Sequence, residues 1–147
     1  VKLVGEAFFS VAKDEKKFIV GTLNNSKIVV HGTEFNVEAY KGSRTVQTTL
    51  VSGKVSFSYV NNGRRNNVMM IPGQKVIYDI VREKVVVKEV NVDVETCWKD
   101  GRLIFRNTPF EDILKSLSKR YNVEFILSKN LLLITRVQLW GLSPGFC

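Results

Sequence analysis

Apolar and polar residues alternate along most of the first 95 residues of the chain. The clearest case follows a turn at Gly32, where every second residue is apolar or small: Thr33, Phe35, Val37 and Ala39. The positions between them are Glu34, Asn36 and Glu38. Successive side chains of a β-strand leave opposite faces of the sheet, so this alternation predicts a half-buried strand.

Segments of the same pattern precede and follow this strand, and breaks containing Gly, Asn or Lys separate them. Their spacing of roughly 8–12 residues is typical of an all-β domain. The first segment is predicted to be kinked or bulged near Gly5. Residues 61–67 (Asn-Asn-Gly-Arg-Arg-Asn-Asn) are predicted to be a hairpin loop, because Asn and Gly tolerate positive φ values. The predicted strands lie at residues 1–12, 18–21, 27–31, 33–40, 45–50, 54–59, 68–71, 76–81 and 84–94.

The pattern changes after Trp98. Residues 102–106 alternate as a strand, and a helix is predicted to follow with Thr108 as its N-cap. Pro109 suits the first helical position, and Glu111 lies where a capping box needs an acid. The apolar stripe of this helix has the spacing of a single face, and it consists of Phe110, Ile113, Leu114, Leu117 and Tyr121.

A strand containing Val123, Phe125 and Leu127 would complete a βαβ unit, so we expect an all-β domain at 1–95 and a small α/β domain at 98–147. Residues from about 130 onward fit this unit poorly, because the apolar run there alternates only weakly. A βαβ unit needs more sheet and another helix to cover it. We therefore expect a partial, apparently truncated second domain with an atypical tail.

The composition of the chain indicates a class of protein but no specific chemistry. The 147 residues, 44% of them hydrophobic, suffice for one ordinary domain or two small ones with a core. A net charge of +8 is spread along the chain and is most simply a lysine-rich solvated surface. Cys97 and Cys147 show neither a disulfide framework nor metal-ligand spacing, and we expect both to remain thiols.

No apolar run approaches the roughly 18 residues that a membrane-spanning helix needs. The chain begins without Met, within strand-like sequence. We expect it to be a soluble piece of a longer protein, with any anchor or targeting segment outside it.

The residues offer no catalytic or cofactor site. His31, the only histidine, lacks nearby partners for a metal site or a catalytic triad, and a structural role is expected for it. No nucleophile, zinc or paired-carboxylate motif is present. The sequence therefore predicts a protein that is not an enzyme and needs no cofactor.

Several short motifs recur in a specific order along the chain. In the first domain they are Gly5-Glu6-Ala7-x-Phe9-x-Val11, Phe18-x-Val20, Gly32-Thr33-x-Phe35-x-Val37, Thr49-Leu50-x-x-Gly53-x-Val55 and Ile71-Pro72-Gly73-Gln74. The second domain begins with Trp98-x-x-Gly101-x-Leu103-x-Phe105-x-x-x-Pro109-Phe110. Together these motifs resemble the FecR-like sigma-factor regulators of the Bacteroidetes type, and the Trp98 pattern is similar to the start of their small C-terminal domain. The resemblance runs through residues 1–90, resumes at Trp98, and ends near residue 129.

The resemblance implies a fold, a location and partners. The β domain would be a solenoid-like or sandwich-like stack of short strands. The chain would be the periplasmic part of an anti-sigma factor anchored in the inner membrane by a segment absent from this chain. A cytoplasmic region, also absent, would bind an extracytoplasmic-function sigma factor, and the signalling domain of a TonB-dependent receptor would deliver the signal.

The same resemblance assigns a structural role to the motif residues Gly5, Glu6, Ala7, Gly32, Thr33, Phe35, Val37, Gly53, Pro72 and Gly73. Partner contacts are predicted at Phe110, Tyr121, Val123 and Phe125. A sheet that lacks a strand leaves an open edge at residues 123–128, which could accept a strand of the transducer or of a second copy in a homodimer.

Two other classes of function compete with this interpretation. A glycan-binding β module of the cell envelope needs exposed aromatic residues along a groove, whereas Phe57, Tyr59 and Tyr78 follow the parity of core positions. Nucleic-acid binding needs a continuous basic face, whereas the charge is evenly spread and Arg64 and Arg65 are interpreted as a solvated loop tip. We therefore expect no nucleic-acid partner.

Overall fold

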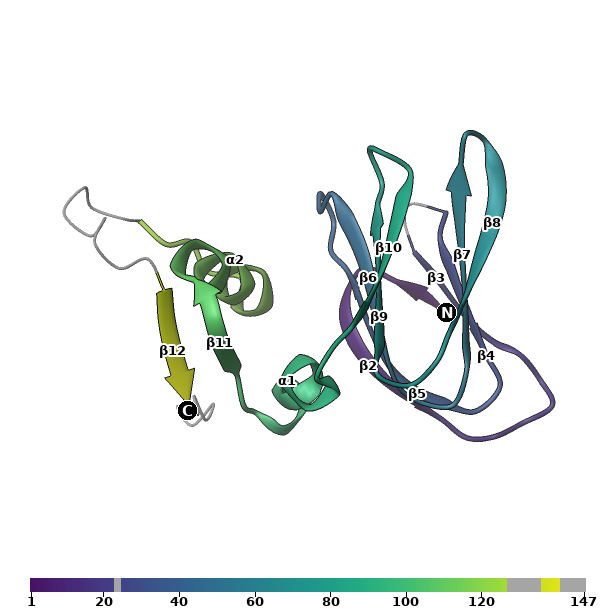
Figure 1. The fold of residues 1–147 in the computed structure, drawn as a ribbon, viewed down its shortest axis with the longest axis horizontal. Helices are drawn as coiled ribbons and strands as arrows, with labels where there is room; N and C mark the ends of the chain where they lie inside the picture. Colours follow the sequence, from purple (N-terminus) through teal and green to yellow (C-terminus); the bar gives the residue numbers. More distant parts are fainter. Residues whose placement is uncertain (23–24, 127–135, 141–147) are drawn as a thin grey trace. The chain divides into compact units, whose positions relative to one another are not determined.

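The computed structural model describes residues 1–22, 25–126 and 136–140, and for residues 136–140 only the backbone. The chain divides into two compact units, Val1–Glu95 and Thr96–Cys147 (Figure 1). Each unit is described below by itself.

Unit 1 consists of two five-stranded sheets. Sheet I contains, in spatial order, β1 (Lys2–Leu3), β3 (Phe18–Thr22), β4 (Lys27–Val30), β7 (Val55–Asn61) and β8 (Arg64–Met70). Sheet II contains, in spatial order, β2 (Gly5–Val11), β5 (Thr33–Ala39), β6 (Thr45–Ser52), β9 (Gln74–Asp79) and β10 (Lys84–Glu89). Neighbouring strands are antiparallel except for β1 and β3, which are parallel.

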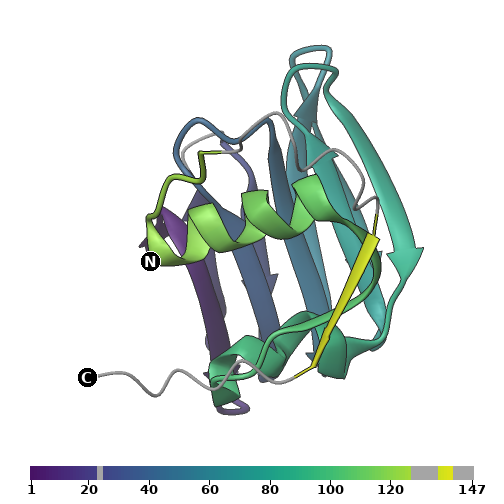
Figure 2. The same ribbon diagram turned by 90° about the vertical axis from the view of Figure 1, so that its left-hand side faces the viewer.

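The chain alternates between the two sheets along unit 1. β1 belongs to sheet I and β2 to sheet II, and the hairpins β3–β4, β5–β6, β7–β8 and β9–β10 then belong to the two sheets in turn. Both sheets therefore grow in the same direction, and in Figure 2 the strands follow one another from purple to teal. The predicted sandwich-like stack of short strands is confirmed, because each successive hairpin adds two strands to one of the two sheets.

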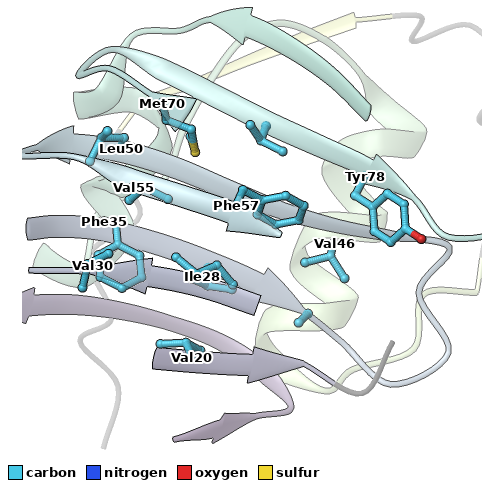
Figure 3. Packing of buried hydrophobic residues seen from close by; sticks show 13 residues of the cluster. Val20, Ile28, Val30, Phe35, Val46, Leu50, Val55, Phe57, Met70 and Tyr78 are labelled. Atoms are coloured by element: carbon cyan, nitrogen blue, oxygen red, sulfur yellow. The ribbon is translucent and has the colours of Figure 1, made fainter. Parts of the chain in front are cut away.

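The inward faces of the two sheets meet in one apolar core (Figure 3). Phe35 of sheet II stacks on Phe9 with ring centroids 5.1 Å apart, and Phe9 lies 5.9 Å from Phe18 of sheet I. At the other end Tyr78 lies 6.3 Å from Phe57. The fully or almost fully buried core residues are Val20, Ile28, Val30, Phe35, Val37, Val46, Leu50, Val55, Phe57, Met70, Val76 and Tyr78.

Three sequence predictions in unit 1 are wrong. Residues 1–12 form two strands in different sheets, because Gly5, with φ 119°, lies where the chain leaves sheet I for sheet II. The loop expected at 61–67 is only the turn Asn62-Gly63, whose φ values of 50° and 72° suit a tight hairpin, so Arg64 and Arg65 are part of strand β8.

The third wrong prediction is the strand at 84–94, which ends at Glu89. The helix α1 (Val92–Thr96) follows, because the Asn91 Oδ1 atom accepts hydrogen bonds from the backbone N–H groups of Asp93 and Val94 at 3.1 and 3.3 Å. An Asn followed by acidic residues is the usual start of a helix. The sequence therefore contains a helix-start signal at Asn91, within the segment that alternation predicts to be a strand.

Unit 2 contains a 3₁₀-helix (Cys97–Asp100), β11 (Ile104–Pro109), α2 (Phe110–Tyr121) and β12 (Arg136–Trp140). β11 and β12 pair antiparallel. The helix α2 begins one residue later than predicted, and no side chain caps it. Thr108 is held in the strand by pairing with Val137, and its hydroxyl donates to the Arg106 carbonyl at 3.2 Å, so the expected capping box does not form.

The strand expected at 123–128 is absent from its described part, residues 123–126. The partner of β11 is instead β12, which lies in the segment interpreted as an atypical tail. The described part of unit 2 is therefore a helix with an antiparallel strand pair, which differs from the parallel βαβ unit that the sequence predicted. Within the described ranges no helix is both long and apolar enough to cross a membrane.

Removing one hydroxyl tests how the two sheets are held together. The Tyr78 hydroxyl of β9 donates a 2.8 Å hydrogen bond to the Val60 carbonyl of β7, and burial together with the nearby Glu83 carboxylate raises the pKa of Tyr78. We expect Tyr78→Phe to lower the free energy of unfolding by about 1 kcal/mol, because the carbonyl loses its partner. Urea unfolding followed by fluorescence would measure this. Tyr59→Phe is the control, and equal losses in both variants would contradict the role of the hydrogen bond.

Candidate protein-interaction surface

The motif glycines of unit 1 lie where the chain crosses between the sheets. Gly5 is the first residue of β2, directly after the β1–β2 connection. Gly32, Gly53 and Gly73 lie in the connections β4–β5, β6–β7 and β8–β9, and all four glycines have φ between 87° and 125°. A side chain is strained at such φ values. The sequence motifs therefore mark the corners of the sandwich.

Two of these corners touch each other. A Cβ atom on Gly53 would lie 2.5 Å from the Gly32 carbonyl oxygen and 2.9 Å from Thr33 Oγ1. The Thr33 hydroxyl donates to the Lys54 carbonyl at 3.1 Å. A Cβ atom on Gly32 would lie 2.6 Å from the Lys13 Cα atom. The three connections therefore pack backbone against backbone, which leaves no room for a side chain or a ligand.

The corner at Pro72 and Gly73 is a tight turn between β8 and β9. The Gln74 N–H donates to the Ile71 carbonyl at 3.2 Å, and Gly73 with φ 88° occupies the position that needs positive φ. The Gly73 N–H also donates to the Leu50 carbonyl at 3.0 Å. The turn thus ties the end of sheet I to β6 of sheet II.

The other motif residues lie in the strands. Glu6 accepts hydrogen bonds from Asn36 Nδ2 at 3.0 Å and from the Tyr40 hydroxyl at 3.1 Å, which join the edge strand β2 to β5. Ala7 pairs with Val37 on the core side. Phe35 and Val37 are fully buried. These positions hold the strands of the sandwich together.

Other candidate residues of unit 1 also lack the surroundings of a site. His31 is exposed beside the Gly32 corner, and the described residues contain no group of three or more potential metal ligands. Phe57 and Tyr78 are buried and Tyr59 is half-buried, so they line no glycan groove. Arg65 donates to the Asn25 carbonyl and to Ser58 Oγ, at 3.3 and 3.2 Å, from within β8.

Unit 2 presents a different kind of surface. Leu103 and Ile113 are buried, and the Arg120 guanidinium lies 5.3 Å from the centre of the Trp98 ring. The helix α2 ends at Asn122, which has φ 53°, and the Val123 N–H donates to the Ser118 carbonyl at 3.3 Å. This left-handed turn ends the helix and redirects the chain.

The residues at this turn expose four large apolar side chains in close succession. Tyr121, Val123, Phe125 and Ile126 are 48%, 45%, 41% and 93% exposed, and we call residues 121–126 the apolar segment. Grouped apolar and aromatic side chains on a surface are typical of protein contacts. Three of the predicted contact residues therefore lie together, whereas Phe110 lies half-buried at the start of α2.

Sequence reasoning missed Ile126, the most exposed of these residues. Alternation placed Val123 and Phe125 on one face of a strand and Ile126 on the other. Because residues 123–126 form no strand, that parity does not apply there. The signal available in the sequence was the presence of four large apolar residues within the six positions 121–126, at the end of the predicted helix.

Models of known protein families match both units of the chain. Residues 1–56 match the family model "FecR protein", and residues 102–138 match "FecR, C-terminal". The chain belongs to the FecR-like family. The C-terminal match corrects the prediction that the resemblance ends near residue 129, because it continues into β12.

Solved structures show the same relationship along most of the chain. Two crystal structures of a protein from Parabacteroides distasonis ATCC 8503, provisionally named an anti-sigma factor, are 28% identical to this FecR-like chain, with TM-scores of 0.72 and 0.71. Each match covers 95% of this chain and 63% of the other, so the chain spans less than two thirds of those proteins. No curated protein matched the chain.

The family match gives the corner glycines a testable role. We expect Gly53→Ala to destabilise unit 1 of this FecR-like chain by more than about 2 kcal/mol, because positive φ and the contact with the Gly32 carbonyl both oppose a Cβ atom. Thermal unfolding measured by circular dichroism would show the loss.

Gly63→Ala is the matched control for this prediction. Gly63 also has positive φ, at 72°, but nothing lies within 4 Å of its Cβ position. We expect the control to lose only the backbone contribution, about 1 kcal/mol. Equal losses in the two variants would show that the corner contact contributes nothing.

Proposed function

We propose that this chain is the periplasmic part of a membrane-anchored sigma regulator, and that it receives its signal by protein contact at the apolar segment. The observation that carries the proposal is the exposure of Tyr121, Val123, Phe125 and Ile126 in the unit that matches the FecR C-terminal family. The family membership and the anti-sigma name of the P. distasonis protein support a regulatory role. The protein would be regulatory and not an enzyme.

The partner in this proposal is the signalling domain of a TonB-dependent outer-membrane receptor. Such a contact needs an apolar centre that loses water on binding, surrounded by polar residues. The apolar segment offers two aromatic rings and two branched aliphatic side chains, with Asn122 and Glu124 between them. The composition therefore suits a protein partner better than a small polar ligand.

The remaining parts of the regulator lie outside this chain in the proposal. An inner-membrane anchor would precede Val1, and a cytoplasmic region would hold an extracytoplasmic-function sigma factor. Homodimer formation through residues 123–128 stays a prediction, and the described residues 123–126 form no strand that could pair there.

Two single substitutions test the contact. Phe125→Asp and Ile126→Asp place a charge in the centre of the apolar segment, and we expect each to weaken binding of the receptor signalling domain at least about tenfold. Isothermal titration calorimetry with the whole chain would measure the affinity. Circular dichroism would confirm that the variants fold, since both side chains are exposed.

Val81→Asp is the matched control, because Val81 is 73% exposed on the β9–β10 turn of unit 1. We expect unchanged affinity in this variant. If Phe125→Asp and Ile126→Asp bind as tightly as the unaltered chain, the apolar segment is not the contact site. If the unaltered chain binds no receptor signalling domain, the proposed input is wrong.

A further inference from the structure

The two sheets of unit 1 differ in the charges that their strands carry. The charged residues in the strands of sheet I are all basic: Lys2, Lys27, Arg64 and Arg65. The strands of sheet II contain every strand carboxylate of unit 1: Glu6, Glu34, Glu38, Asp79 and Glu89. The strand charges of sheet I are therefore of one sign, whereas sheet II mixes these carboxylates with Lys75, Lys84 and Lys88.

The strand register arranges the outer face of sheet I into two neighbouring rows. Ile19 pairs with Val29, Val29 with Ser56, and Ser56 with Met69. These residues form a row across four strands that is apolar except for Ser56, and we call it the apolar row. Met69 and Ile19 are 63% and 43% exposed.

The second row is basic and polar. Lys2 pairs with Gly21, Gly21 with Lys27, Lys27 with Ser58, and Ser58 with Asn67. Lys2 and Lys27 are exposed. Arg65 contacts this row by donating a hydrogen bond to Ser58, which is buried. The face therefore combines an apolar row, a basic row and no carboxylate among its strand residues.

We propose that the outer face of sheet I binds an anionic phospholipid surface, with the basic row at the headgroup phosphates and the apolar row in contact with the acyl boundary. The inference rests on the proposed location of this chain beside the inner membrane. Cationic side chains next to exposed apolar ones are the composition that holds proteins at an anionic interface.

The uniform sign of the charge favours lipid over an acidic protein partner. A bilayer with anionic lipids is negative everywhere, so it disfavours any carboxylate on the face that meets it. The face also belongs to an open sheet whose rows extend over several strands, which suits a broad surface. Val1 lies at its edge, where its amino group donates to the Ile19 carbonyl at 2.8 Å, so a membrane anchor preceding Val1 would leave from this sheet.

Matched lysine pairs test the proposal in the whole chain. Lys2→Gln with Lys27→Gln removes two charges from the outer face of sheet I, and Lys84→Gln with Lys88→Gln removes two exposed charges from β10 of sheet II. Both double variants have the same net charge. Co-sedimentation would be measured with vesicles of phosphatidylcholine alone and with an equal mixture of phosphatidylglycerol and phosphatidylcholine.

We expect the chain to bind the mixed vesicles, more weakly as salt is added, and to bind phosphatidylcholine vesicles little. Each basic side chain near such a surface contributes about fivefold to binding, so the Lys2/Lys27 variant should lose about 25-fold and the Lys84/Lys88 variant much less. Met69→Ser should also weaken binding, whereas Val86→Ser, at an exposed position of sheet II, should not.

Several results would overturn the proposal. They are the absence of binding to mixed vesicles, and equal losses in the two lysine pairs, which would indicate net charge alone. Loss of receptor-domain binding in the Lys2/Lys27 variant without any vesicle binding would assign the face to an acidic protein instead. Receptor binding through Phe125 and Ile126 is measured without vesicles, so this proposal and the proposed function can fail independently.

Discussion

The apolar contact between the inward faces of the two sheets is the interaction on which unit 1 depends. A single hairpin cannot bury its apolar face and is marginal in water. Here each hairpin covers the opposite sheet, so that residues such as Phe35, Leu50 and Phe57 lose all contact with water. Burial of that apolar surface is the dominant favourable contribution to folding.

This packing explains why glycines are the recognisable feature of the sequence. Because consecutive hairpins belong to opposite sheets, the chain must cross the edge of the sandwich repeatedly and within a few residues. Gly5, Gly32, Gly53 and Gly73 lie at four of these crossings with positive φ. At Gly32 and Gly53 the backbones also approach each other more closely than a side chain would allow. The motifs that identify the family are thus requirements of its topology.

Both proposed contacts with other molecules use positions outside the apolar core. Many outward-facing residues of sheet I and the residues that follow helix α2 lie outside the apolar core, so charge and exposed apolar groups can collect there. The left-handed turn at Asn122 places the part of the apolar segment after Tyr121 outside the helix. Unit 1 provides a sandwich with one apolar core, and the proposed contacts lie on the outer face of its sheet I and in unit 2.

The sequence by itself determined most of the strands of unit 1 and their inward faces, although not the break at Gly5, the extent of β8 or the end of β10. It could do so because alternation is a local property of the sequence. In a strand, residues such as Phe35 and Val37 share one face, so both are buried when that face packs on the opposite sheet. Tertiary structure alone decided which strands share a sheet, since the conformation at Gly5 converts one apparent strand into two. It also decided the pairing of β11 with the distant β12, which holds Thr108 in a strand and prevents the capping box. The exposure of Ile126 was likewise not predictable from alternation. Alternation assigns a residue to a buried or an exposed face only when the residue lies in a paired strand, and residues 123–126 form no strand.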